Sequence, residues 1–171
     1  MFNRSLTPLA LLLCSTVAAP ASDTEHRLRL FHTHTGEHID VIYRHGADYD
    51  KEALARLDSF LRDSRTGDVH SYDPRLFDLL SDLTAAAGHP DEEIHVVCGY
   101  RSPATNSMLR RTTSGVAKNS LHMQAEAIDI RMPNVKTSVL RKVALDLHQG
   151  GVGYYPKSNF LHVDLGRVRR W

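Results

Sequence analysis

Two apolar segments of this chain are interrupted by side chains that do not suit a core, and this constrains the fold more than any other feature. The segment EAIDIRM places Asp129 between Ile128 and Ile130, and the segment NFLHVDLG carries His162 and Asp164 in a similar run. A bare carboxylate is costly to bury, so these groups must line a cleft, pair with a partner or bind a metal ion. The fold must therefore provide a polar site beside its apolar strands.

Strand geometry indicates how these side chains can meet. Alternate residues of a strand point to one face, which puts Phe160, His162 and Asp164 together. If the two strands are neighbours, Asp129 and His162 converge, and His122 can reach them from the preceding loop. Two imidazoles and one carboxylate, with a position left for water, are the ligands of a catalytic zinc site. The same set suits ferrous iron in an oxygenase, or a group of polar residues that satisfy one another, so spacing alone leaves the choice open.

The first 21 residues have the pattern of a secretory signal peptide. Arg4 is followed by an apolar run that ends at Ala19 and by a small-residue pattern that ends at Ala21, so we expect cleavage after Ala21. The apolar run is too short for a comfortable membrane span, and a retained anchor is the alternative. The prediction is an exported protein with one domain over residues 22–171 and no membrane span after cleavage.

Composition narrows the class of partner. Without the predicted signal peptide the chain has equal numbers of cationic and anionic side chains, so it has no basic field that would favour nucleic acid. An apolar content of 42% is enough for a core. Cys98 is then the one remaining cysteine, which excludes an internal disulfide, and its apolar neighbours suggest a small buried hydrophobe.

The rest of the chain alternates segments typical of helices and strands. Residues 27–44 alternate polar and apolar side chains around TGE, which predicts a hairpin, and the C-terminal segment GVGYYPKSNFLHVDLG reads as two strands joined by a turn. Asp73, Pro74 and Gly88 are placed as the cap, first turn and end of one helix. We expect an α+β fold with helices on one side of a small, mostly antiparallel sheet. The predicted helices are 49–63, 73–88, 102–111 and 138–151, and the predicted central strands are 93–100 and 126–132.

Several segments resemble a known family. SLHMQAEAID resembles the Ser-x-His-x-x-Gly-x-Ala-x-Asp motif of the zinc D,D-peptidases, which have a Hedgehog-type fold. More narrowly, HTHTGE, LRDSRTGDVHSYDPRLFDLL, GYRSPATNSMLR and GGVGYYPKSNFLHVDLG resemble the MepK (YcbK-like) murein endopeptidases, from about Leu28 to Trp171. The resemblance implies a periplasmic zinc hydrolase that cuts peptide cross-links of peptidoglycan. The alternative is a catalytically degenerate module of the same fold that binds peptidoglycan without cutting it.

The resemblance also implies roles for particular residues. It makes His122, Asp129 and His162 the zinc ligands, and it places Ser120 beside the site as a residue that supports the ligands. Arg101 in GYRSP falls on the arginine that assists at the substrate carbonyl in related dipeptidases.

The chain departs from the family pattern at two points. Ala125 stands where the motif has glycine, which adds strain if the backbone there needs a positive φ. Asn159 and Phe160 occupy the positions from which relatives supply a glutamate or histidine base. Asp164 is therefore the candidate base, since it shares a strand face with His162, and its alternative role is to orient that ligand.

Two further features flank the proposed site. His32 and His34 alternate in a predicted strand, and we expect them at an edge of the cleft rather than in a second metal site. Trp171 follows a basic C-terminal run and is expected to dock on the sheet, and Tyr154 and Tyr155 are expected mainly to pack.

Overall fold

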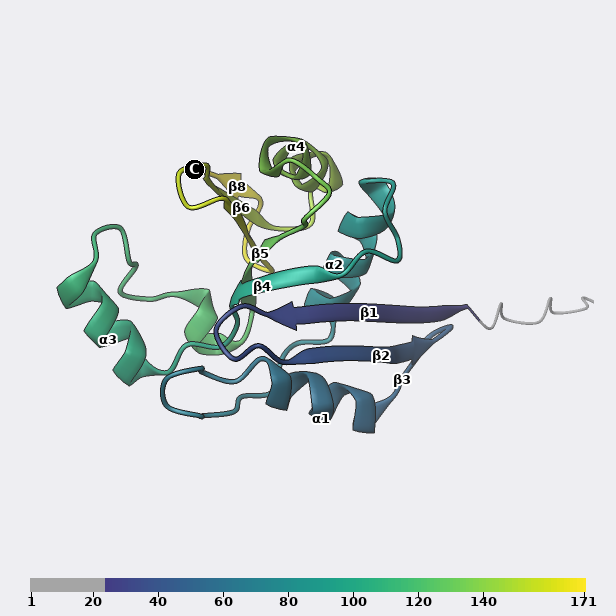
Figure 1. The fold of residues 1–171 in the computed structure, drawn as a ribbon, viewed down its shortest axis with the longest axis horizontal. Helices are drawn as coiled ribbons and strands as arrows, with labels where there is room; N and C mark the ends of the chain where they lie inside the picture. The colour runs from purple at the N-terminus through teal and green to yellow at the C-terminus, as the bar shows by residue number, and fades with distance from the viewer. Residues whose placement is uncertain (1–23) are drawn as a thin grey trace, which may run out of the picture.

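The structure, a computed structural model, describes residues 24–171, so the predicted signal peptide lies outside the described residues. Within them, eight strands form one open sheet with the order β3-β2-β1-β4-β5-β7-β6-β8 (Figure 1). The β1–β4 and β6–β8 pairs are parallel and the other neighbours are antiparallel. The strands are β1 (Glu25–His32), β2 (His38–His45), β3 (Asp48–Tyr49), β4 (Ile94–Cys98), β5 (Ala127–Arg131), β6 (Gly151–Tyr155), β7 (Phe160–Asp164) and β8 (Arg169–Arg170).

Four α-helices accompany this sheet within residues 24–171, and the α+β prediction is confirmed. They are α1 (Lys51–Phe60), α2 (Arg75–Ala86), α3 (Pro103–Thr112) and α4 (Thr137–Leu147), and a short 3-10 helix, η1, spans Leu121–Gln124. Asp50 caps α1 by accepting hydrogen bonds from two backbone N–H groups, as its type predicts. The helix expected to begin at Pro74 begins one residue later, although Asp73 still accepts a hydrogen bond from the Arg75 N–H.

The two faces of the central strands differ in character. In β5 and β7 the apolar residues Ile128, Ile130, Leu161 and Val163 join one continuous core with α1, α2 and α4. Strand alternation sends the intervening polar residues to the opposite face. That face therefore carries the site, and the core behind it holds the strands in place.

The N-terminal hairpin differs from its prediction in one detail. β1 ends at His32, and the chain turns through residues 33–37 before β2 begins. His34 therefore lies in a turn rather than on a strand face shared with His32. Gly36, with φ +74°, supplies the left-handed conformation that this turn needs.

The C-terminus docks on the sheet as predicted. The Trp171 N–H donates to the Val152 carbonyl, and the Trp171 carbonyl accepts from Tyr154. The indole lies over Gly153, where an added Cβ would approach it to 2.7 Å, so only glycine fits beneath the ring. No helix within residues 24–171 is long and apolar enough to cross a bilayer.

Candidate metal centre and active-site cleft

The register of the central strands brings the candidate ligands into one row. Asp129 in β5 lies directly opposite His162 in β7 on one side and opposite Cys98 in β4 on the other. Residues that lie opposite each other in an antiparallel pair point to the same face. The row therefore presents a thiol, a carboxylate and an imidazole side by side on the polar face.

His122 joins the row from the loop that precedes β5. It lies in η1, which ends at Ala125 in the left-handed conformation with φ 53° and ψ 37°. The condition raised from the sequence is thus met, since the φ of Ala125 is positive, and alanine there costs roughly 1 kcal/mol relative to glycine. The tight turn directs the chain into β5, and the Arg101 N–H donates to the His122 carbonyl.

Three ligand atoms converge at the centre of the site. Asp129 Oδ1 lies 2.9 Å from His162 Nδ1 and 3.3 Å from His122 Nε2, and the two imidazole nitrogens lie 3.1 Å apart. Tetrahedral zinc, with ligands at about 2.0–2.1 Å, separates them by about 3.3 Å. All three side chains are at least nine-tenths buried. The donor set and its spacing therefore fit a metal ion.

Each imidazole is oriented by a second partner. His122 Nδ1 donates to the Gly99 carbonyl at 2.9 Å, which leaves Nε2 as a free acceptor facing the centre. His162 Nε2 lies 2.9 Å from Asp164 Oδ2, so Nδ1 faces the centre. This arrangement is typical of metal-binding histidines, because the outer hydrogen bond selects the tautomer and raises ligand basicity.

The charges at the centre stabilise one another. Burial would raise the pKa of Asp129, but His122 and His162 lower it well below its ordinary value. Burial would likewise lower the pKa of His122, but Asp129 and Cys98 raise it above its ordinary value. Without a metal ion, the pair is thus held as an imidazolium and a carboxylate, and a metal ion would take the place of the imidazolium proton.

Asp164 lies behind His162, on the side of the ring away from Asp129. It is fully buried and its two oxygens accept hydrogen bonds from both terminal nitrogens of Arg169, at 2.7 and 2.9 Å. The backbone N–H groups of Gly151 and Gly166 donate to it as well. Burial opposes ionisation, yet the bonds from His162 and Arg169 hold the pKa of Asp164 well below its ordinary value. This geometry favours orientation of His162 over proton abstraction.

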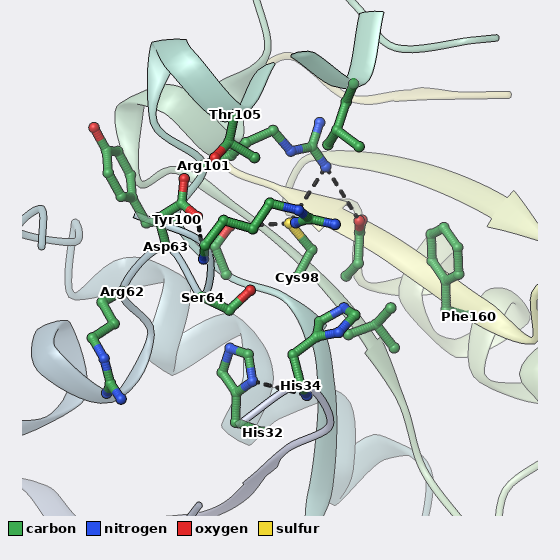
Figure 2. A pocket seen from close by; sticks show the side chains of 15 residues that line it. His32, His34, Arg62, Asp63, Ser64, Cys98, Tyr100, Arg101, Thr105 and Phe160 are labelled. Carbon is green, nitrogen blue, oxygen red and sulfur yellow. Dashed lines mark hydrogen bonds and ion pairs between the residues drawn. The ribbon is translucent and has the colours of Figure 1, made fainter. Parts of the chain in front are cut away.

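Arg101 lies on the open side of the centre. Its Nη2 is 3.9 Å from Asp129 Oδ2 and donates to Cys98 Sγ at 3.4 Å (Figure 2). The side chain is 12% exposed, and its Nε is buried without a hydrogen-bond partner among residues 24–171. A guanidinium held this loosely at the rim of the centre has donors left for a ligand.

Cys98 offers a second possible set of ligands. Its Sγ and ligand atoms of His122 and Asp129 lie within 4.8 Å of one another, and nearby His122 lowers the pKa of the thiol although burial opposes this. We favour His162 as third ligand, because its separations of 2.9 and 3.1 Å match tetrahedral coordination and Asp164 orients it. The sequence predicted Cys98 as a small buried hydrophobe and did not indicate that it lies beside Asp129.

The remaining candidates lie at or near the site in different ways. Ser120 precedes η1 and lines the cleft, but its hydroxyl makes no hydrogen bond within the described chain, so its supporting role stays a prediction. Asn159 turns away, with φ 52°, and its side chain accepts a hydrogen bond from Thr137 at the start of α4. Phe160 lines the cleft on the ligand face. The two positions that carry a base in relatives therefore supply none here.

Two cavities adjoin the ligands and share Arg101, Asp129 and Phe160. The smaller, about 170 Å³, extends towards the hairpin turn and the α1–α2 loop and contains both histidines of the predicted cleft edge (Figure 2). The larger, about 410 Å³, extends along the 113–121 loop towards Tyr155 and Trp171. The candidate ligands thus lie within a cleft with room on either side.

Known proteins match this chain over most of its length. The family model Peptidase_M15_2, described as peptidoglycan L,D-endopeptidase MepK, matches residues 20–171. The probable peptidoglycan L,D-endopeptidase MepK of Haemophilus influenzae is 42% identical over 161 residues, which cover 94% of this chain and 87% of that protein. The peptidoglycan L,D-endopeptidase MepK of Escherichia coli K12 is 43% identical over 144 residues, covering 84% and 79%. The Shigella flexneri protein of the same name gives the same values.

Proposed function

Because the chain belongs to the peptidoglycan L,D-endopeptidase MepK family, we propose that it is a zinc-dependent endopeptidase that hydrolyses peptide cross-links of peptidoglycan in the periplasm. The resemblance expected from the sequence is confirmed, and with it the assignment to the metallopeptidases. The oxygenase alternative is disfavoured, since each relative named above is an endopeptidase.

The observation that carries this proposal is the convergence of three ligand atoms inside a cleft that continues on both sides. His122, Asp129 and His162 are the proposed ligands, and all three line the larger cavity, from which a water molecule could reach a metal ion that they held. Nitrogen and oxygen donors at tetrahedral spacing with one open position are typical of catalytic zinc. When bound, zinc would polarise the scissile carbonyl and bring the pKa of a water molecule towards ~7.

The names of the relatives indicate which of the two kinds of cross-link is cut. The link between two diaminopimelate residues joins the carbonyl of an L-centre to the amine of a D-centre, whereas the link from D-alanine to diaminopimelate has D-centres on both sides. The relatives are L,D-endopeptidases, so we infer the first bond for this chain. The smaller cavity suits an anionic group of the stem peptides, since Arg65 lines it without an ion pair among the described residues.

The chain's own residues divide the remaining work. Arg101 lines both cavities, where its guanidinium would hold the carbonyl oxygen as negative charge develops. Asp164 would orient His162 and stiffen the centre through Arg169, a role that replaces the base considered from the sequence. Ser120 would contact substrate or solvent in the larger cavity.

The last part of the proposal concerns the location of the protein in the cell. Residues 1–21 carry the signal-peptide pattern, and peptidoglycan lies outside the cytoplasmic membrane, so we place the protein in the periplasm. Fractionation of cells that express the full chain, followed by N-terminal sequencing, tests this. A protein retained in the cytoplasm with an intact N-terminus would contradict the placement.

The activity is tested with purified protein and two defined muropeptide dimers, one linked through two diaminopimelates and one through D-alanine. Each is incubated with added zinc, with chelator, and with chelator followed by zinc. We expect monomers from the first dimer only when zinc is present. His122→Ala is the matched inactive variant, since it removes one proposed ligand.

The outcomes separate the alternatives. A degenerate binding module would bind sacculi without releasing monomers under any condition, and the endopeptidase proposal would then be wrong. Cleavage of the D-alanine dimer alone would keep the enzyme but overturn the choice of bond. Elemental analysis of protein purified without chelator identifies the metal, and stoichiometric iron would overturn the choice of zinc.

A further inference from the structure

The site described above lacks a proton acceptor. Peptide hydrolysis needs a group that takes a proton from water and returns one to the leaving amine. Asn159 faces α4, Phe160 has no titratable atom, and Asp164 is buried behind His162. The acceptor must come from another part of the cleft.

The described residues that line the two cavities offer few other candidates. Asp63 is buried, and its two oxygens accept hydrogen bonds from the N–H groups of Arg65, Thr66 and Ser102. Burial opposes ionisation, but these bonds and one from Thr105 lower the pKa of Asp63 to about 2, which makes it a weak proton acceptor at neutral pH. Asp63 instead pins the 61–68 loop to the start of α3.

The other histidine and the thiol of the small cavity are engaged as well, and burial raises the pKa of Tyr100, whose neutral phenol is a poor proton acceptor. His32 is 1% exposed, and its Nδ1 accepts from the N–H groups of His34 and Thr35, which fixes it as a structural side chain of the turn. Burial, and then the neighbouring His34, lower the pKa of His32. The Cys98 thiol contacts Arg101 and the Gly99 carbonyl. The Tyr155 hydroxyl accepts from Trp171.

His34 differs from His32, the other histidine that lines this cavity. Its side chain is exposed at the mouth of the 170 Å³ cavity, and neither ring nitrogen bonds to another residue of the described chain. Asp129 lines the same small cavity from β5, and Figure 2 shows the His34 ring on the wall below Cys98 and Phe160. The backbone beneath the ring is held, because the His34 N–H donates to His32 and the turn closes through Gly36 and Glu37. The ring is therefore presented to the cleft while its nitrogens stay free.

We propose that His34 is the catalytic residue that transfers the proton, an inference that rests on the proposed endopeptidase function. The water oxygen bonds to the scissile carbonyl carbon as one water proton passes to the His34 imidazole. The carbon–nitrogen bond then breaks, its electron pair stays on nitrogen, and His34 returns the proton to that nitrogen. The products are an amine half and a carboxylic acid half that keeps the second water proton until it ionises into solvent, and the imidazole ends as it began. Imidazole is the side chain used most often for this exchange at neutral pH.

The titratable and charged groups around His34 come from several elements that face the cavity. They are His32 from β1, Glu37 from the turn, Arg62, Asp63 and Arg65 from the 61–68 loop, Cys98 from β4, Tyr100 and Arg101 ahead of α3, and Asp129 from β5. Arg62 is paired with Glu37 at 2.8 Å, so its charge is largely compensated.

The test compares His34→Gln with His45→Gln, an exposed histidine at the far end of β2. Zinc content, circular dichroism, kcat and KM on the diaminopimelate-linked dimer, and the pH profile of kcat are measured for each. For His34→Gln we expect unchanged zinc content and fold, a near-normal KM, and a kcat lowered by ~10²–10⁴-fold. The limb of the pH profile that reports the base should disappear, and added imidazole should restore part of the turnover of His34→Ala. His45→Gln should match the wild type.

Three results would overturn the inference. The first is a kcat for His34→Gln within about threefold of the wild type. The second is loss of zinc in step with activity, which would make His34 a ligand or a structural residue. The third is a rise in KM with kcat unchanged, which would make it a binding residue. If zinc-loaded wild-type protein cleaves neither dimer, the proposed function fails and this inference fails with it, which distinguishes that case from the other three.

Discussion

Replacement of Asp164 by asparagine separates the two roles considered for this carboxylate. The amide side chain would keep the shape but lose the charge that His162 and Arg169 share in the native protein, where the bonds measure 2.9 Å and 2.7–2.9 Å. Loss of an outer hydrogen-bond partner typically lowers metal affinity by ~10–100-fold, or about 1.4–2.7 kcal/mol. We therefore expect weaker zinc binding in Asp164→Asn, with most of the turnover restored at saturating zinc.

The same substitution should destabilise the metal-free protein. Breaking a buried ion pair by removing one partner costs about 3–5 kcal/mol, but the Arg169 side chain is 33% exposed and water recovers part of this. We expect a loss of about 2–4 kcal/mol in the free energy of unfolding, measured by urea denaturation with chelator present. Asp146→Asn is the control, since its pair with Lys142 lies on the surface of α4 and should contribute little.

A zinc titration against a chromophoric chelator distinguishes the two roles of Asp164. Turnover at saturating zinc is measured on the same protein. Zinc affinity within about threefold of the wild type, together with a turnover lowered ~100-fold or more, would refute the orienting role. Asp164 would then be the base, and the assignment of that role to His34 would be wrong.

Three further changes test other parts of the structure. Cys98→Ala should retain zinc and His162→Ala should lose it, as read by elemental analysis; the reverse pattern would make Cys98 the third ligand. Asp63→Asn should lower the free energy of unfolding by about 1–3 kcal/mol, because an amide N–H would face the buried Ser102 N–H. The pKa of Asp63 is lowered on folding, so its contribution is present above the ordinary carboxyl range near pH 4 and lost as the pH falls towards about 2; equal acid sensitivity in both proteins would contradict this. Arg65→Gln should raise KM for cross-linked dimers about tenfold with zinc content unchanged, because this guanidinium lines the cleft without an ion pair in the described chain; an unchanged KM, or an equal rise in the surface control Arg56→Gln, would exclude a binding role.

Local sequence patterns were enough to predict most of the helices and strands. The caps, the leucine spacing and the β-branched runs place α1, α2, β4 and β5 within a few residues of their predicted ends. The helix predicted over residues 138–151 ran too far, since α4 ends at Leu147 and Gly151 begins β6. The placement of His34 on a strand was wrong for a local reason: the strand stops at His32 because the backbone turns back through Gly36. Alternation alone cannot show where a hairpin turn begins.

Residue types and their spacing were enough to show which side chains could hold a metal ion, because an imidazole or carboxylate within an apolar strand has few stable environments. They could not show which nitrogen of His162 faces the centre, that Cys98 stands beside Asp129, or that Asp164 lies behind the ring. Those facts depend on the register between β4, β5 and β7, which join segments about 30 residues apart in the chain. Side-chain alternation is a property of one strand, whereas a register is set by the packing of all of them against a common core. The proposed division between the groups that bind a metal ion and the group that orients one of them therefore follows from the packed sheet.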